Sequence, residues 1–381
     1  MAFWSFTQRD HKALASSSRN TPNSNPTIPR DGEFVAALDD LLPSLLKDSA
    51  MVSIEKLPFN SPAADFGAFP YEGGVVFASS RNNSAPLRQD FEWMQQPYLD
   101  LFHVAKDSTK GWRKPELLPA AINTRYHESN FFMVPGGNQA VFTRNDFFET
   151  RQGQKHAGVI LLQTYFAEMK GLEVGEITPF AWNNHEYSVG HACVSSDGSK
   201  MYLVSDMPGG QGGKDIYVST RQGSGWSQPR NLGAPVNTLG DEMFPYLHSD
   251  GTLYFASNGH PGLGHLDIFK AKLDEPEVKI RNLGYPINSP FDDFAFLLES
   301  DGANGYLSSN RTGGMGDDDI YRFKIEGVRV EIIVRDKNAK LPIENAKIRV
   351  MDEGTGSPTI SPTARAASCS RQPQIATLMA L

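Results

Sequence analysis

The feature that most constrains this chain is a stretch of about 20 residues that occurs three times. The first copy, at residues 196–219, is SDGSKMYLVSDMPGGQGGKDIYVS; the others, from residues 249 and 300, are SDGTLYFASNGHPGLGHLDIF and SDGANGYLSSNRTGGMGDDDIY. Each begins with a turn, continues as a strand of β-forming residues and reaches a second strand through a glycine-rich loop. The turns are Asp197-Gly198, Asp250-Gly251 and Asp301-Gly302. The pattern predicts repeated antiparallel hairpins.

Two more divergent copies precede these three, which gives five units of about 50–60 residues. The units begin at Leu57, Leu118, Thr178, Gly233 and Gly284. Each carries an Asn, and the fifth residue after it is Ser188 in the third unit and an acid in the others, namely Asp65, Glu128, Glu242 and Asp293. The third strand opens with Asp, an apolar residue and an aromatic residue in four units, at Asp100, Asp215, Asp267 and Asp319; in the second unit this motif has degenerated to Val159-Ile160-Leu161.

Units of three or four strands have the size of propeller blades, and a ring of such sheets buries both faces of each sheet and protects most edges. We therefore predict an all-β chain with a five-bladed β-propeller over residues 50–326, six blades being less favoured. Residues 47–56 are the candidate for the strand that closes the ring. Blades are expected near residues 57–117, 118–177, 178–232, 233–283 and 284–325.

The segments on either side of the propeller lack this repeat. Residues 1–30 are rich in Ser, Asn, Pro and Thr and are expected to be disordered, and residues 31–49 predict a short helix interrupted by Pro43. Residues 327–354 alternate as two strands and predict part of a β-sandwich. Residues 355–381 have no period and predict a disordered tail. Because the pattern breaks off inside a domain, we expect a truncated or frame-shifted gene.

Composition agrees with many short strands and argues against several classes of protein. The chain has 381 residues with 34 Gly and 25 Pro, and its net charge of −8 argues against nucleic-acid binding. It contains no apolar run long enough for a transmembrane helix, and no signal peptide is visible. Its two cysteines, Cys193 and Cys369, cannot make a disulfide framework or a metal site. We expect Cys193 to be buried and unreactive, and we expect no metal or cofactor.

The acids that follow the repeated Asn allow two interpretations. They could surround the mouth of a channel and bind a cation, or each could accept N–H bonds inside its own blade, which the repetition favours. The loop acids Asp317–Asp319 lack the spacing of a calcium loop. His260 and His265 lack a third metal ligand nearby and are expected to be exposed. The glycine run at residues 209–213 does not lead into a helix and supports phosphate binding only weakly.

Taken together, Ser-Asp-Gly, an aromatic strand, a glycine-rich loop and Asp-Ile-Tyr resemble the TolB-type (WD-like) β-propeller repeat. The forms NSPAADFGAF and NSPFDDFAF resemble the propeller of Bacteroidetes OmpA-family envelope proteins, and residues 328–354 are similar to the carboxypeptidase-regulatory-like domain that follows it. The resemblance covers residues 52–354 and implies a place at the periplasmic face of the outer membrane, in assemblies linked to peptidoglycan or type IX secretion. The peptidoglycan-binding domain of those proteins is not visible in this chain.

These features predict a non-catalytic protein-interaction scaffold of the cell envelope, with envelope or secretion-machinery proteins as partners. Residues 81–97 and 145–156 are long insertions between repeated strands, and aromatic residues there are favourable contact points. The aromatic residues in or next to these insertions, which could equally pack under their loops, are Phe91, Trp93, Tyr98, Phe147 and Phe148. The alternative is a carbohydrate-binding or glycoside-hydrolysing propeller, which requires an aromatic-lined central pocket and two carboxylates outside the repeat.

Overall fold

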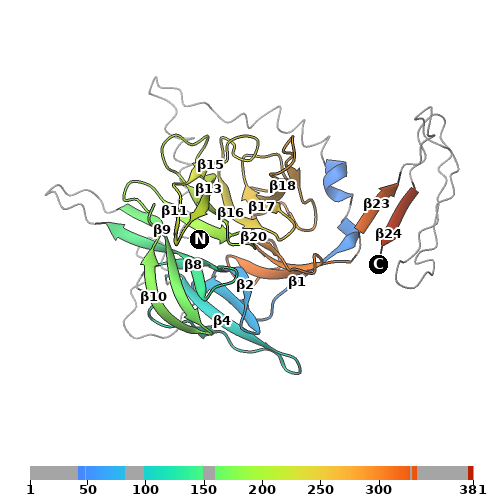
Figure 1. Cartoon of the computed structure of the whole chain (residues 1–381). Coiled ribbons are helices and arrows are strands. Elements are labelled where there is room, and N and C mark those ends of the chain that lie inside the picture. Colours follow the sequence, from blue (N-terminus) through green and yellow to red (C-terminus); the bar gives the residue numbers. More distant parts are fainter. Residues whose placement is uncertain are drawn as a thin grey trace, which may run out of the picture.

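A computed structural model describes residues 42–47, 49–81, 98–124, 126–148, 159–326, 328–332 and 376–380. Most of them lie in short strands or in the turns between strands (Figure 1). Five antiparallel sheets follow one another along the chain, each packs on the next, and the last packs on the first. This arrangement is a five-bladed β-propeller, as the repeat predicts. The described residues contain no helix that is long and apolar enough to cross a bilayer.

The strands of each of the first four blades follow one another in the sequence from the innermost strand outward. The first contains β2 (Asp65–Tyr71), β3 (Gly74–Ser79), β4 (Asp100–Asp107), β5 (Gly111–Trp112) and β6 (Glu116–Leu117). The second contains β7 (Glu128–Met133), β8 (Gln139–Phe148), β9 (Val159–Lys170) and β10 (Glu173–Pro179). The third contains β11 (Val189–Val194), β12 (Lys200–Ser205), β13 (Asp215–Gln222), β14 (Gly225–Trp226) and β15 (Arg230–Asn231). The fourth contains β16 (Glu242–Leu247), β17 (Thr252–Ser257), β18 (Asp267–Lys272) and β19 (Arg281–Asn282).

The fifth blade contains β20 (Asp293–Leu298), β21 (Asn304–Ser309) and β22 (Asp319–Ile325), and its outer strand comes from the beginning of the propeller. This strand, β1 (Val52–Lys56), pairs antiparallel with β22, with Val52 opposite Ile325. The prediction that residues 47–56 close the ring is therefore confirmed for Val52–Lys56. Such closure removes the open edge that a row of blades would otherwise leave.

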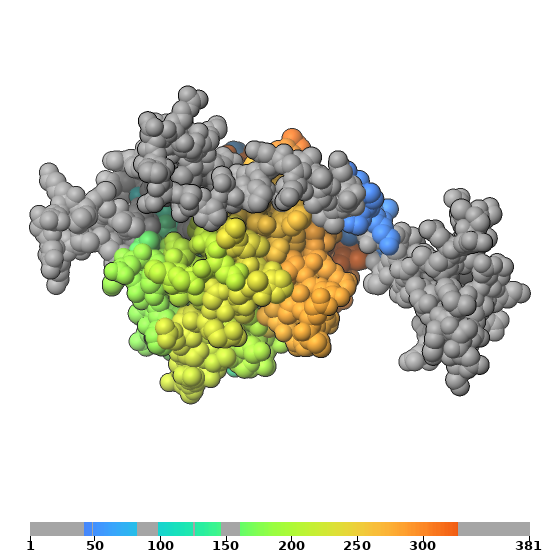
Figure 2. Space-filling view, turned by 90° about the horizontal axis from the view of Figure 1, so that it is seen from above, coloured from blue at the N-terminus to red at the C-terminus, as the bar shows by residue number. Residues whose placement is uncertain are grey.

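The segment before β1 also packs on the last blades. It forms a helix over residues 42–46 and the 3₁₀ turn η1 (Ser49–Met51). Leu45 is buried, and its carbonyl oxygen accepts a hydrogen bond from the Tyr285 N–H group at 2.9 Å. In Figure 2 these blue residues lie directly against the orange atoms of the ring. Pro43 does not interrupt this helix, as the sequence suggested, because it lies in the first turn, where no backbone N–H partner is lost.

The core lies between neighbouring blades. Because the second strand of a blade is covered on both faces, it is buried almost continuously instead of alternating, as in β12 and β17. Phe77, Phe142 and Phe255 occupy equivalent places in three of these strands and are completely buried. Burial of each such ring contributes about 1.5–3 kcal/mol to the free energy of unfolding.

The second blade departs from the other four. The β8–β9 ladder continues to the pair Phe148–Val159, four residue pairs beyond Arg144, which pairs with Glu128 at the start of β7. β9 (12 residues) begins at Val159, where the sequence analysis places the altered opening of this strand, and it is longer than the third strands of the other blades. β10 has 7 residues, whereas β19, the outer strand of the fourth blade, has 2.

The residues after the propeller form a separate two-stranded antiparallel sheet. β23 (Val328–Ile332) pairs with β24 (Ala376–Ala380), with Val328 opposite Ala380. The prediction of a disordered tail over residues 355–381 is therefore wrong for these last strand residues. The expected disordered N-terminus at residues 1–30, and residues 333–354 of the expected β-sandwich, lie outside the described residues.

Candidate functional site

The two ends of the ring differ in the connections that they carry. Successive strands of a blade run in opposite directions, so the links between blades and the loops between second and third strands lie at one end, which we call the loop end. The hairpin turns lie at the other end, the turn end. The Asp-Gly sequences occupy these turns, where each Asp accepts the N–H group two residues later, at 2.9–3.0 Å, and each Gly has a positive φ. These pairs are Asp197-Gly198, Asp250-Gly251 and Asp301-Gly302.

The acids after the repeated Asn begin the inner strands at the loop end, and all four are completely buried. Each binds the N–H and hydroxyl groups of the Ser or Thr four residues before it; Asp293 accepts from Ser289 at 2.5 and 2.8 Å. The same contacts join Asp65 to Ser61, Glu128 to Thr124 and Glu242 to Thr238. These oxygens are used inside their own blades, so they are poorly placed to share a cation.

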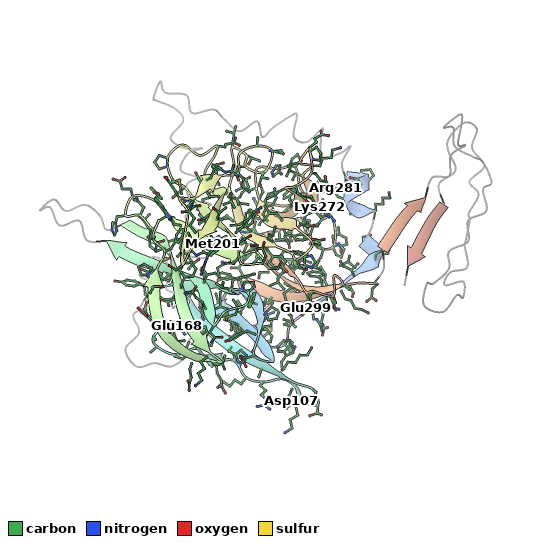
Figure 3. All side chains as sticks on the ribbon, in the orientation of Figure 1. Asp107, Glu168, Met201, Lys272, Arg281 and Glu299 are labelled. Carbon is green, nitrogen blue, oxygen red and sulfur yellow. The ribbon has the colours of Figure 1, made fainter. Side chains whose placement is uncertain are left out.

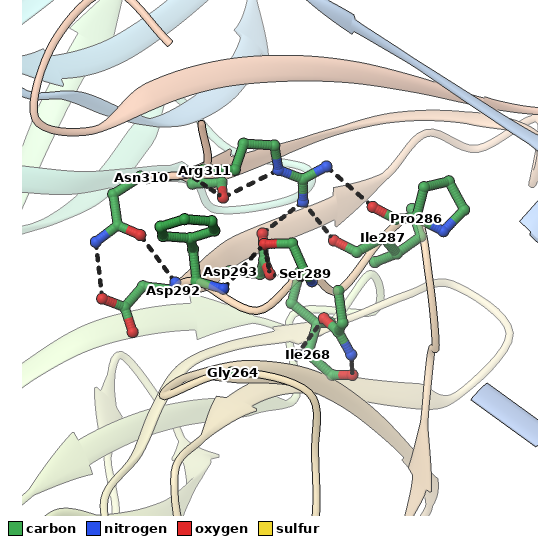
Figure 4. A network of polar contacts seen from close by, with 12 residues as sticks. Gly264, Ile268, Pro286, Ile287, Ser289, Asp292, Asp293, Asn310 and Arg311 are labelled. Atoms are coloured by element: carbon green, nitrogen blue, oxygen red, sulfur yellow. Dashed lines mark hydrogen bonds and ion pairs between the residues drawn. The ribbon is translucent and has the colours of Figure 1, made fainter. Parts of the chain in front are cut away.

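Three of these acids also pair with a mostly buried arginine that the sequence analysis missed. The Arg311 guanidinium lies 2.5 Å from Asp293 and donates to the carbonyl oxygens of Pro286 and Ile287 (Figure 4). The other two pairs are Arg81–Asp65 at 2.6 Å and Arg144–Glu128 at 3.1 Å. A signal was present, because Arg81 and Arg311 each stand two residues after the last Ser of a second strand.

The fourth blade lacks this arginine. His260 takes its place: one ring nitrogen, Nε2, lies 2.9 Å from the Val236 carbonyl oxygen, and the ring packs on Phe269. His260 is therefore half-buried rather than exposed as predicted, whereas His265 is exposed. Glu242 binds only hydroxyl and N–H groups among the described residues, including the Ser257 hydroxyl at 2.8 Å. Burial raises the pKa of Glu242 to about 7.

The glycine-rich loops are built around the acid that opens the third strand. A Cβ atom on Gly210, Gly262 or Gly314 would overlap the carboxylate that follows five residues later, at Asp215, Asp267 or Asp319. The loop amides already donate to these carboxylates, as Met315 N–H does to Asp319 at 2.6 Å. The run at residues 209–213 is therefore shaped around a carboxylate: the Gln211 N–H group donates to Asp215, and the Gly213 N–H group donates to the Gly240 carbonyl oxygen. Asp100 is equally buried in the first blade.

The repeated Asn residues join neighbouring blades. In every unit the side-chain amide donates to the carbonyl oxygen, and the side-chain oxygen accepts the N–H group, of one residue in the third strand of the preceding blade. A side chain thus imitates a paired strand and satisfies two buried backbone groups. The pairs are Asn60–Ile320, Asn123–Leu101, Asn183–Thr164, Asn237–Ile216 and Asn288–Ile268.

Aromatic rings fill the described part of the central axis. Each inner strand has a β-bulge whose residue adopts a positive φ: Gly67, Asn130, His191, Phe244 and Ala295. The rings of His191 and Phe244 stack with centroids 3.9 Å apart, and Phe244 also contacts Phe66 of the first blade, across the ring. Nearer the turn end, Phe132 and Tyr246 meet across the axis at 6.2 Å. The central pocket that the carbohydrate alternative requires is therefore not open at these levels.

Two further points concern the thiol of Cys193 and metal-binding side chains. Cys193 is buried, and burial raises the pKa of its thiol to about 12, as expected for an unreactive cysteine. Among the described residues, no group of three or more His, Cys, Asp or Glu side chains is placed to hold a metal ion.

Of the predicted contact residues, the structure places Tyr98 and the backbone of Phe147 and Phe148 at the loop end of the first two blades. Tyr98 is half-buried, and its ring lies 4.7 Å from that of His127. His127 accepts the Leu99 N–H group on Nδ1 at 3.0 Å, and its carbonyl oxygen accepts the Asn145 N–H group at 2.9 Å, so it joins the ends of both insertions. Phe147 and Phe148 belong to β8 rather than to a loop, and their side chains lie outside the described part, as do Phe91 and Trp93.

Comparison with protein-family models and with curated proteins finds no match. Solved structures are similar at low identity. A protein of unknown function from Dyadobacter fermentans shares 10% identity over 72% of this chain and 99% of its own, with a TM-score of 0.40. A thermostable family-43 glycoside hydrolase shares 11% identity over 70% of this chain and 91% of its own, with a TM-score of 0.41. TolB from Acinetobacter baumannii shares 14% identity over 66% of this chain and 51% of its own, with a TM-score of 0.34.

Proposed function

We propose that this protein is a non-catalytic interaction scaffold of the bacterial cell envelope, which binds envelope or secretion-machinery proteins at the loop end of its first two blades. The observation that carries the proposal is the arm formed by residues 145–148 of β8 and 159–162 of β9. This two-stranded ladder extends past the start of β7, so it projects from the ring. The repeat's resemblance to the propellers of OmpA-family envelope proteins supports the location at the periplasmic face of the outer membrane.

The base of the arm is held firmly, as a contact surface requires. His127 binds Leu99 on one side and Asn145 on the other, and the Tyr98 ring packs against it at an angle of 58°. Burial lowers the pKa of His127 to about 3, so the ring stays neutral and keeps Nδ1 as an acceptor. The commitment of the repeated acids to their own blades, and the filled axis, favour a scaffold over a glycosidase.

The test is cross-linking and pull-down of the full chain, exported to the periplasm of a Bacteroidetes host. We expect recovery of envelope or secretion-machinery proteins from the unmodified chain, and loss of that recovery in the triple variant W93A/Y98A/F147A. The matched control is Leu117→Ala, since Leu117 is a 42% exposed apolar residue on the outside of the first blade. Binding to a glycan array without recovery of any protein would overturn the proposal.

A further inference from the structure

The outer edge of β10 is an open strand at the rim of the second blade (Figure 1). Among the strands that the structure describes it pairs only with β9, and its 7 residues compare with 2 in β19. Long open edges are places where another chain can add a strand, and most proteins shorten or cover them. The described outer strands of the first, third and fourth blades have 2 residues each and β1 of the fifth blade has 5, so β10 is the longest outer strand that the structure describes.

The hydrogen-bond pattern shows which amides of β10 face outward. Val174 lies opposite Met169, whose N–H group donates to Asn138 of the neighbouring hairpin at 2.5 Å, away from β10. At the other end, the Phe180 N–H group donates inward to Thr164 at 2.9 Å. Inward and outward pairs alternate along an antiparallel ladder, and the register shift between Val174 and Ile177 moves that alternation by one residue, so the N–H and carbonyl groups of both residues point away from β9.

The strand β10 itself carries acidic side chains, and the surface beside it is hollowed. Glu173 and Glu176 of β10 and Glu168 of β9 are all exposed, and β10 itself contains no basic residue. Figure 3 places Glu168 toward the rim of this blade, away from the buried Met201. A groove of about 770 Å³ borders Glu173, Val174 and Gly175 and continues to Gly198 of the third blade; Lys170 and Arg221 also line it, so the acidic side chains that an added strand meets first are those of β10 itself. Side chains of an added strand can enter it.

We propose that β10 binds an extended, basic segment of a partner protein by strand addition. Backbone bonds to Val174 and Ile177 would supply affinity, and Lys or Arg residues opposite the glutamates would supply selectivity. A second copy of the chain is the poorer occupant, because two β10 edges would bring their glutamates together. This surface is distinct from the arm at the loop end, so the inference goes beyond the proposed function.

The first test uses fluorescence anisotropy with labelled eight-residue peptides of alternating Lys and Val, and of alternating Glu and Val. We expect the full chain to bind the Lys peptide, more weakly as salt rises, and to reject the Glu peptide. The matched variants are Val174→Pro, which removes the outward N–H group, and Val174→Ala, which keeps it. Affinity for the Lys peptide should fall about tenfold in V174P relative to V174A.

Equal affinity of V174P and V174A, or equal binding of both peptides, would overturn the inference. So would a dimer, seen by sedimentation, that V174P abolishes, because the occupant would then be a second copy. The triple variant W93A/Y98A/F147A should bind the Lys peptide like the unmodified chain. This result distinguishes failure of the proposed binding at the arm from failure of the proposed strand addition at β10.

Discussion

The side-chain amide of Asn60 pairs with both backbone groups of Ile320, which lies 260 residues further along the chain: Nδ2 donates to the carbonyl oxygen at 2.9 Å, and the Ile320 N–H group donates to Oδ1 at 3.0 Å. The same contact joins Asn288 to Ile268, only 20 residues away. One contact type thus both links neighbouring blades and closes the ring.

Asn60→Ala removes the partners of two buried backbone groups, so we expect the free energy of unfolding to fall by about 1–3 kcal/mol. Asn288→Ala is the matched control and should cost a similar amount in chemical denaturation. Hydrogen exchange separates them, because the first variant should speed exchange of the β22 amides and the second that of the β18 amides. Identical exchange maps would contradict this.

Glu242→Gln should change how stability depends on pH. Burial raises the pKa of Glu242 to about 7 from its ordinary 4.5, so the folded state holds its proton more tightly than the unfolded state does. This carboxyl therefore costs nothing below about pH 4.5 and destabilises the fold increasingly up to about pH 7. The stability of E242Q relative to the unmodified chain should rise by up to about 3 kcal/mol across that window. Denaturant titrations at several pH values measure the free energy of unfolding of both chains. If this free energy depends on pH in the same way for E242Q and the unmodified chain, the prediction is refuted.

Arg311→Met leaves the buried carboxylate of Asp293 without its cation, which should cost about 3–5 kcal/mol at neutral pH. Burial already raises the pKa of Asp293, and Arg311 opposes that rise, so the variant should recover stability as the pH falls and Asp293 takes up a proton. The double variant R311M/D293N should recover much of the loss at neutral pH. If the double variant is no more stable than R311M, the pairing is not the cause.

Gly314→Ala should destabilise the last blade by about 1–3 kcal/mol, because the added Cβ atom overlaps the Asp319 carboxylate. Gly137→Ala is the control: the nearest atoms to its new Cβ lie 3.9 Å away, so its effect should stay within about 0.5 kcal/mol. Thermal unfolding of both variants measures the difference. Equal melting temperatures would show that the loop moves to accommodate the added Cβ atom, which would contradict the prediction.

The sequence predicts the blades because the repeat carries its own turns. Asp-Gly at residues 197–198 and the opening Asp215 mark two strand boundaries in one unit, and the structure keeps both. The bulges could not be predicted in the same way. Among the five bulge residues with positive φ, Gly67 and Asn130 belong to types that adopt it readily, whereas Phe244 adopts it because packing on His191 at the axis overrides local preference.

The candidate site was only partly predictable, for a related reason. Tyr98 was singled out as an aromatic residue near a long loop, but His127 was not, since its role comes from contacts with Leu99 and Asn145 that lie far apart in the sequence. The second unit lacks the repeat at its third strand, and residues outside a repeat give no period from which the 12-residue β9 could be inferred.

The closing strand also decides how the ring responds to tension. Val52 begins β1 and Ile325 ends β22, yet the two residues face each other, and the Glu326 N–H group donates to the Met51 carbonyl oxygen at 2.7 Å. A pull on the chain before Val52 and after Ile325 therefore meets the seam at one end. Such a force breaks the β1–β22 backbone pairs one after another from that end, rather than loading all of them together. In a protein held between two anchored neighbours, this seam is where the ring yields first.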